Sequence, residues 1–176
     1  MTSALTVLMP VYNAAKHLRE ATESILNQSF SNFEFLIIDD ASTDDSVEII
    51  KSYSDPRIRL VVNEQNLGVL ATLNKGIEIA SSELIARMDA DDISHPGRLE
   101  LQFEYFKRFS ETALLSTSFN VIDEGNSIVE TLEVDDFYNC YNLNFYCAIC
   151  HPSVMYRRSI VKSVHNRRVT YGTIKI

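Results

Sequence analysis

The sequence predicts an α/β fold, with one doubly wound, mainly parallel sheet flanked by helices. Short apolar segments alternate with segments of helical periodicity, a pattern typical of βαβ units. Polar or acidic residues directly follow three of the apolar segments. The chain has 176 residues, enough for one domain with a real core. We therefore expect a single domain over residues 1–176, with its core at about 5–158.

Four apolar segments in the first half are the expected strands of this sheet. Each segment is short and ends at Pro, Asp or another polar residue, as buried strands commonly do. These segments cover residues 5–9, 33–38, 57–62 and 83–88.

Four expected helices alternate with these strands. Apolar residues at helical spacing predict the first, third and fourth of them. The pattern Ser42-x-x-Asp45 has capping-box character and predicts a second helix that runs to about Tyr53. Pro96 is suited to open the fourth helix. The apolar residues that mark the other helices are Ala14, Leu18, Ala21 and Ile25, then Leu70, Leu73, Ile77 and Ala80, then Leu99, Phe103 and Phe106.

The second half has a less regular pattern. Residues 113–119 and 127–134 are expected strands around a turn at 124–126. Residues 135–146 are expected to be helical, and residues 153–156 to form a further strand. No apolar run is long enough to span a membrane, and no signal segment opens the sequence. We therefore expect a cytoplasmic protein, whose odd number of cysteines fits reduced thiols.

The charge of the chain is unevenly distributed. The net charge of −8 argues against non-specific nucleic-acid binding. Residues 137–176 nevertheless carry six Lys or Arg residues and no carboxylate. This basic region, with an atypical tail at about 159–176, can be interpreted as a peripheral contact with an anionic membrane surface at the inner face. The alternative is an ordinary solvated face whose acidic partners lie elsewhere in the fold.

The run Asp89-Ala90-Asp91-Asp92 places three carboxylates within four positions at the end of an expected strand. Like charges this close repel each other, and a divalent cation such as Mg²⁺ or Mn²⁺ is the usual compensation. Glycine-rich phosphate-binding motifs are absent from the sequence. The charge of a bound phosphate must then be met by metal or side chains. Ligands of doubly wound sheets bind beyond the carboxyl ends of the strands, which is where this run is expected to lie.

Other interpretations of the acidic run remain. An EF-hand loop does not match, because Ser94 stands where that loop needs Gly. A strand followed by Asp-x-Asp is also the outline of an aspartate-nucleophile phosphohydrolase, in which Asp89 would attack phosphorus. A solvated acidic turn before the next helix is the third interpretation.

Six motifs in order resemble those of the family-2 nucleotide-sugar glycosyltransferases, which have the GT-A fold. The resemblance covers about residues 6–158 and indicates a GT-A-type, Rossmann-like sheet. The motifs are Met9-Pro10-Val11-Tyr12-Asn13, residues 38–44 (Ile-Asp-Asp-Ala-Ser-Thr-Asp), Asn66-Leu67-Gly68, Asn74-Lys75-Gly76, residues 87–92 (Arg-Met-Asp-Ala-Asp-Asp) and residues 151–157 (His-Pro-Ser-Val-Met-Tyr-Arg).

The resemblance implies a role for each motif. Asp40 would accept a hydrogen bond from the base, expected to be uracil. Asp91 would ligate Mg²⁺ or Mn²⁺ at the donor diphosphate, with Asp89 beside the ribose or the metal and Asp92 assisting. His151 would lie near the donor or the metal. The nucleotide-sugar site as a whole would comprise Pro10, Val11, Tyr12, Asp40, Asn66, Gly68, Arg87, Met88, Asp89 and Ala90.

The resemblance further implies transfer of a sugar from a UDP-sugar, with inversion, to a glycan or lipid-linked acceptor in bacterial cell-surface polysaccharide biosynthesis. Members of this family carry an acidic pair after the His-Pro segment that supplies the catalytic base. No carboxylate follows Asp136 here, so the expectation is a C-terminally truncated member with an unassigned base. A non-catalytic nucleotide-sugar-binding remnant is the main alternative, with the phosphohydrolase as a further one.

Overall fold

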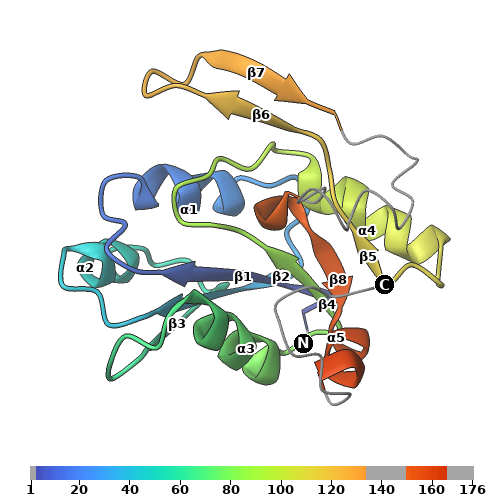
Figure 1. Ribbon diagram of the computed structural model, residues 1–176, viewed down its shortest axis with the longest axis horizontal. Coiled ribbons are helices and arrows are strands. Elements are labelled where there is room, and N and C mark those ends of the chain that lie inside the picture. Colours follow the sequence, from blue (N-terminus) through green and yellow to red (C-terminus); the bar gives the residue numbers. More distant parts are fainter. Residues whose placement is uncertain (1–2, 134–149, 166–176) are drawn as a thin grey trace.

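A computed structural model describes residues 3–133 and 150–165 of the chain. Its main sheet has the strand order β3-β2-β1-β4-β8-β5 (Figure 1). The strands are β1 (Leu5–Val11), β2 (Phe33–Asp39), β3 (Ile58–Val62), β4 (Leu84–Arg87), β5 (Leu114–Leu115) and β8 (Met155–Arg157). The first four run parallel, and β8 is antiparallel to both of its neighbours. The predicted mainly parallel sheet is confirmed.

Two layers of helices cover the sheet. The helices are α1 (Leu18–Leu26), α2 (Ser46–Lys51), α3 (Val69–Ile79), α4 (Arg98–Arg108) and α5 (Arg158–His165). Side chains of α1, α2 and α4 share one apolar cluster with the sheet, and those of α3 and α5 share the other. Figure 1 shows α1 and α4 on one side of the sheet and α3 and α5 on the opposite side. The central strands are consequently buried on both faces and read as continuous apolar runs.

The predicted second helix begins later than its sequence suggests. The helix α2 starts at Ser46, and its N-cap residue, Asp45, makes no side-chain cap hydrogen bond. The backbone N–H of Ser42 donates to Asp39, and the Ser42 hydroxyl accepts from the backbone N–H of Asn13. The capping-box interpretation of Ser42-x-x-Asp45 is therefore wrong, because tertiary contacts take the Ser42 side chain away from the helix.

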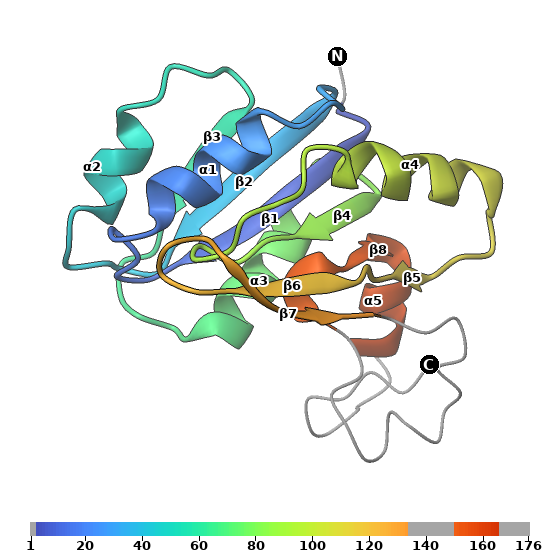
Figure 2. The same cartoon turned by 90° about the horizontal axis from the view of Figure 1, so that it is seen from above.

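The second half also departs from the predicted strand pattern. Residues 114–115 form β5 in the main sheet, whereas the predicted hairpin pairs β6 (Phe119–Ile122) with β7 (Ile128–Leu132) as a separate ribbon. Figure 1 shows the ribbon on the α1 and α4 side of the sheet, farther out than these helices, and Figure 2 shows that it lies beside them and does not cover them. A 3₁₀ turn, η2 (His151–Ser153), leads into β8. The helix predicted for residues 135–146 lies outside the described residues.

The basic residues near the end of the described chain are bound within the fold. Arg158 donates to the carbonyl oxygen of Ala80, and Lys162 pairs with Glu78 at 2.6 Å. Arg157 donates to the carbonyl oxygen of Thr112. Of these three residues, Lys162 has the acidic partner that the solvated-face interpretation expects, whereas the two arginines bond to backbone carbonyl oxygens. In the described part of the chain, no helix has the length and apolar character needed to cross a bilayer.

Candidate nucleotide-sugar site

An open cleft of about 550 Å³ lies at the carboxyl ends of β1, β2 and β4. Four chain segments that are distant in sequence form its walls, because the carboxyl ends of parallel strands meet at one edge of a sheet. Among the residues named from the sequence, those that line the cleft are Pro10, Val11, Tyr12, Asp40, Asn66, Gly68, Arg87, Asp89, Ala90 and Asp91.

Three residues that were given a site role from the sequence do not line the cleft: Met88, His151 and Asp92, which is partly buried. The side chain of Met88 is 2% exposed and packs in the core between two residues that do face the cleft. His151 is exposed on η2, which contacts the end of β4 beside the cleft. The predicted contact of Met88 with a ligand therefore has no support in the position of its side chain.

The carboxylate of Asp40 is buried and surrounded by hydrogen-bond donors. Its Oδ1 accepts from the Asn63 amide at 2.6 Å and from the backbone N–H of Leu67 at 3.0 Å. Its Oδ2 accepts from the backbone N–H of Gly68 at 2.8 Å. Burial raises the pKa of Asp40, but the hydrogen bonds from Leu67, Asn63, Thr72 and Gly68 outweigh it, so the net pKa lies below 3.8. Asp40 therefore holds the loop of residues 63–68 against the cleft as an anion.

Gly68 adopts a backbone conformation in this loop that a residue with a side chain would rarely adopt. Its φ of +83° lies in the region that L-residues rarely adopt. This conformation turns its N–H toward Asp40 and toward the side-chain oxygen of Asn66, at 2.8 Å and 3.0 Å. The motif Asn66-Leu67-Gly68 thus forms a fixed turn at the N-terminus of α3.

The turn after β1 is held by the turn after β2. The side-chain oxygen of Asn13 accepts from the backbone N–H of Thr43 at 2.8 Å. Asp44 accepts from the backbone N–H groups of Ala15 and Ser46, both at 3.0 Å. Burial raises the pKa of Asp44, yet these bonds and the Ser46 hydroxyl bring it below its ordinary value. These contacts fix the cleft wall that Pro10, Val11 and Tyr12 form.

Arg87 and Asp89 form a bidentate ion pair on the opposite wall. Nε of Arg87 lies 3.0 Å from Oδ1 of Asp89, and Nη2 lies 3.1 Å from Oδ2. Asp91 is exposed at the cleft, and no hydrogen bond or ion pair among the described residues engages its carboxylate. Burial and the charges of Asp89 and Asp91 together raise the pKa of Asp92 to about 6. The three carboxylates of the acidic run therefore repel one another, and within the part of the chain that the structure describes, Asp91 is the one whose oxygens are free to bind a ligand in the cleft.

This arrangement fits an octahedral Mg²⁺ or Mn²⁺ ion that takes one or two protein carboxylates and completes its shell with phosphate and water. Asp91 offers unengaged oxygens, and each Asp89 oxygen has a second lone pair beside its Arg87 bond. Across residues 3–133 and 150–165, no group of three or more His, Cys, Asp or Glu is arranged to hold a metal unaided. The residues thus fit a cation that is held jointly with a bound diphosphate.

Several residues at the cleft were not named from the sequence. Lys16, His17 and Thr72 line it directly. Asn63 and Lys75 act behind it, since the Lys75 ammonium donates to the Asn63 side-chain oxygen at 2.6 Å. The signal for Lys75 was present in the motif Asn74-Lys75-Gly76, but its role depends on a partner 12 positions away. Lys16 and His17 follow the β1 turn and only the fold brings them to the cleft.

The sequence profile described as glycosyl transferase family 2 matches residues 6–164. The "Uncharacterized glycosyltransferase MJ1057" of Methanocaldococcus jannaschii is 36% identical over 168 residues, covering 91% of this chain and 58% of that protein. "Glycosyltransferase GlyG" of Streptococcus pneumoniae is 30% identical, covering 78% of this chain and 46% of that protein. The chain thus spans about half the length of these curated relatives.

Solved structures share the fold at lower identity. TarS residues 1–349 of S. aureus superpose with a TM-score of 0.72 at 22% identity, over 91% of this chain and 48% of that one. The mannosyltransferase PcManGT of Pyrobaculum calidifontis, in complex with GDP-Man and Mn²⁺, gives 0.69 at 20% identity, over 93% and 47%. TarS 1–349 has also been solved with UDP-GlcNAc. These similarities confirm the GT-A-type sheet.

Proposed function

This chain belongs to glycosyl transferase family 2, and on that premise we propose that its cleft binds a UDP-sugar together with Mg²⁺ or Mn²⁺ for transfer to a glycan or lipid-linked acceptor. The observation that carries the proposal is the convergence of Pro10–Tyr12, Asp40 and Asp91 on one cleft at the carboxyl edge of the sheet. Nucleotide-sugar complexes of proteins with the same fold support it as well.

Each wall of the cleft suits one part of such a donor. The exposed ring of Tyr12 and the anion Asp40, which line the same side, suit a nucleoside that offers an aromatic face and an N–H donor. Asp91, with Asp89, would hold the cation, which offsets charge on the departing diphosphate when it is bound. Arg87 keeps Asp89 oriented before the donor arrives.

Inversion at the anomeric carbon requires a base that accepts the proton of the attacking hydroxyl. Of the described residues, the carboxylates that line the cleft are Asp40, Asp89 and Asp91. Asp40 accepts three hydrogen bonds from the 63–68 loop, Asp89 is paired with Arg87, and Asp91 is proposed for the metal. Because none is suited to be that base, binding without turnover is the second candidate function.

The Asp91→Ala substitution tests the proposed site. Titration calorimetry of UDP with and without Mn²⁺ should show a metal-dependent gain in affinity for the natural chain and none for this variant. Asp45→Ala removes another exposed carboxylate that has no side-chain cap bond and lies outside the cleft, and it should retain the gain. Unchanged metal-dependent UDP binding by Asp91→Ala would refute the assignment.

Turnover separates the two candidate functions. A panel of UDP-sugars with Mn²⁺ should give transfer or slow hydrolysis if the chain is an active enzyme. Binding of UDP with neither reaction favours the binding module. The phosphohydrolase interpretation requires an Asp89 nucleophile, whereas both Asp89 oxygens accept hydrogen bonds from Arg87. A stable adduct between Asp89 and a phosphate mimic would support the phosphohydrolase interpretation.

A further inference from the structure

Arg98 is a buried cation directly behind the acidic loop, which we define as residues 89–97 between β4 and α4. Its residue is 8% exposed at the first position of α4. Its Nε donates to the Ser94 hydroxyl at 2.8 Å. Its Nη1 donates to the carbonyl oxygens of Arg87 at 3.1 Å and Pro152 at 2.9 Å. One side chain therefore joins the end of β4, the acidic loop and η2.

Gln102 repeats this contact one helical turn later. Its amide donates to the carbonyl oxygen of Ser153 at 2.8 Å, and its residue is 1% exposed. Residues four apart lie on the same face of a helix, so α4 presents both side chains to η2 together. We call Arg98 and Gln102 the α4 clamp. The clamp fixes His151–Ser153 relative to the loop that carries Asp91.

A guanidinium is an expensive group to bury for packing alone. Removing a cation from water costs several kcal/mol unless it is paired and hydrogen-bonded. Among the described residues, Arg98 has no carboxylate within ion-pair distance, and its acceptors are carbonyl and hydroxyl oxygens and the Met88 sulfur. Among the described residues, Asp92 of the acidic loop is the carboxylate whose charge favours the Arg98 cation. The buried charge is thus matched to a loop that holds three carboxylates.

We propose that Arg98 is a positioning residue that presets the acidic loop for a divalent cation and a diphosphate, and that Gln102 extends the same restraint to His151–Ser153. Arg98 contacts neither the cleft nor a ligand position, since it acts through the Arg87 carbonyl and Ser94. With the backbone held there, Arg87 can pair with Asp89 and leave Asp91 open. This inference rests on the proposed function for its ligand, but the restraint itself is a property of the free protein.

The Arg98→Met substitution keeps an unbranched apolar side chain and removes the guanidinium with its charge and donors. In the ligand-free protein, hydrogen exchange should become faster at residues 87–95 and 151–154. Arg57→Met is the matched control, because Arg57 is a half-buried arginine that donates to the Leu26 carbonyl oxygen and pairs with Asp55 before β3. It should raise exchange near residues 55–58 and leave the acidic loop unchanged.

Calorimetry with UDP and Mn²⁺ provides the second readout. Arg98→Met should weaken the Mn²⁺-dependent binding of UDP by about 10–100-fold, the usual effect of removing a partner of a metal ligand. Metal-free UDP binding should change far less. Arg57→Met should change neither the Mn²⁺-dependent nor the metal-free binding of UDP, even if it lowers the melting temperature as much as Arg98→Met does. If Arg98→Met does not fold, Arg98→Lys retains the charge with fewer donors and should show a smaller loss of the same kind.

The outcomes separate this inference from the proposed function. If the natural chain does not bind UDP in the presence of Mn²⁺, the proposed function is contradicted. Hydrogen exchange in the ligand-free proteins is then the measurement that tests the clamp. In a second outcome, the natural chain binds UDP with Mn²⁺, and the Arg98 and Arg57 variants show the same Mn²⁺ dependence and the same exchange in the acidic loop. That result contradicts the clamp and leaves the proposed function standing. Faster loop exchange together with weaker metal-dependent binding in the Arg98 variant alone supports the clamp.

Discussion

At the scale of single residues, Asp40 combines two tasks that a substitution can separate. Its carboxylate orders the 63–68 loop through Asn63, Leu67 and Gly68, and it lines the proposed nucleoside side of the cleft. Oδ1 accepts two of these hydrogen bonds and Oδ2 accepts one. One acceptor position on Oδ2 therefore suits the base of a nucleotide.

The Asp40→Asn substitution should weaken metal-free UDP binding by about 10–100-fold, because bonds to a charged acceptor contribute about 1.5–3 kcal/mol. Titration calorimetry without Mn²⁺ measures this loss. Asn63→Ala disturbs the same loop but leaves the Asp40 carboxylate in place. An equal loss in both variants would mean that Asp40 acts only through the loop and does not contact the base.

Most cleft residues could be predicted from the sequence because each follows an apolar strand, and one edge of a parallel sheet collects such residues. Met88 is one predicted site residue that does not line the cleft, and the alternation of side chains along an extended chain explains its position. With Arg87 and Asp89 at the cleft, Met88 points into the core. Asn63 also follows an apolar strand, but its role and that of Arg98 depend on partners that lie far away in the sequence.

At the scale of elements, helix α3 packs unusually close to β1 at Gly76. A β-carbon at this position would lie 2.3 Å from Cδ1 and 2.7 Å from Cδ2 of Leu8, which is fully buried. The close approach brings Thr72 and Gly68, at the other end of α3, to the cleft. The glycine in the motif Asn74-Lys75-Gly76 is therefore explained by packing.

The Gly76→Ala substitution should lower the free energy of unfolding by about 1–3 kcal/mol through overpacking. Adding Leu8→Val makes room, so the double variant should lose less stability than the sum of the single variants. Urea denaturation measures the coupling. Gly97→Ala is the control, because its β-carbon would meet nothing closer than 3.7 Å. Additive losses at Gly76 and Leu8 would contradict the packing argument.

Contacts between elements also explain where local sequence patterns failed. Ser42 has the composition of a helix cap, but its hydroxyl accepts from Asn13 of the preceding turn. Residues 113–119 look like one strand, yet the chain places 114–115 in the main sheet and 119–122 in the ribbon. Helices and strands with a buried face were predictable from periodicity, whereas their ends depended on partners outside the local segment.

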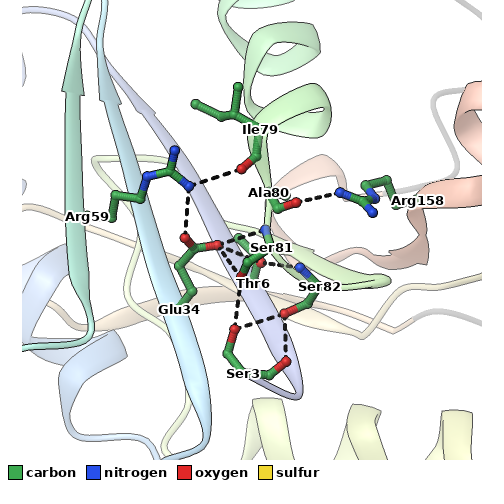
Figure 3. A network of polar contacts seen from close by, with 9 residues as sticks. All are labelled: Ser3, Thr6, Glu34, Arg59, Ile79, Ala80, Ser81, Ser82 and Arg158. Atoms are coloured by element: carbon green, nitrogen blue, oxygen red, sulfur yellow. Dashed lines mark hydrogen bonds and ion pairs between the residues drawn. The ribbon is translucent and has the colours of Figure 1, made fainter. Parts of the chain in front are cut away.

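At the scale of the whole molecule, the two ends of the sheet have separate roles. The cleft occupies the carboxyl ends of the strands, and a polar network that includes no cleft residue joins their amino ends. Figure 3 shows Glu34 of β2 at the centre of this network. Its Oε2 accepts from Thr6 of β1 and from the N–H and hydroxyl of Ser81, which precedes β4. Its Oε1 pairs with Arg59 of β3 at 3.1 Å.

Because this network and the cleft lie at opposite ends of the strands, we expect low pH to reduce the free energy of unfolding through Glu34 without an effect on the cleft. Burial raises the pKa of Glu34, but its bonds to Ser81, Arg59 and Thr6 lower it more, so the folded pKa lies below 4.5. The network's stability is therefore fully present above about pH 4.5 and lost as pH falls through the folded pKa. Glu34→Gln should cost about 1–3 kcal/mol at pH 7, with unchanged UDP binding, and its deficit in urea denaturation should shrink toward pH 3. Because the other carboxylates titrate in both proteins, a deficit that is constant with pH would show that the Glu34 charge does not stabilise the fold.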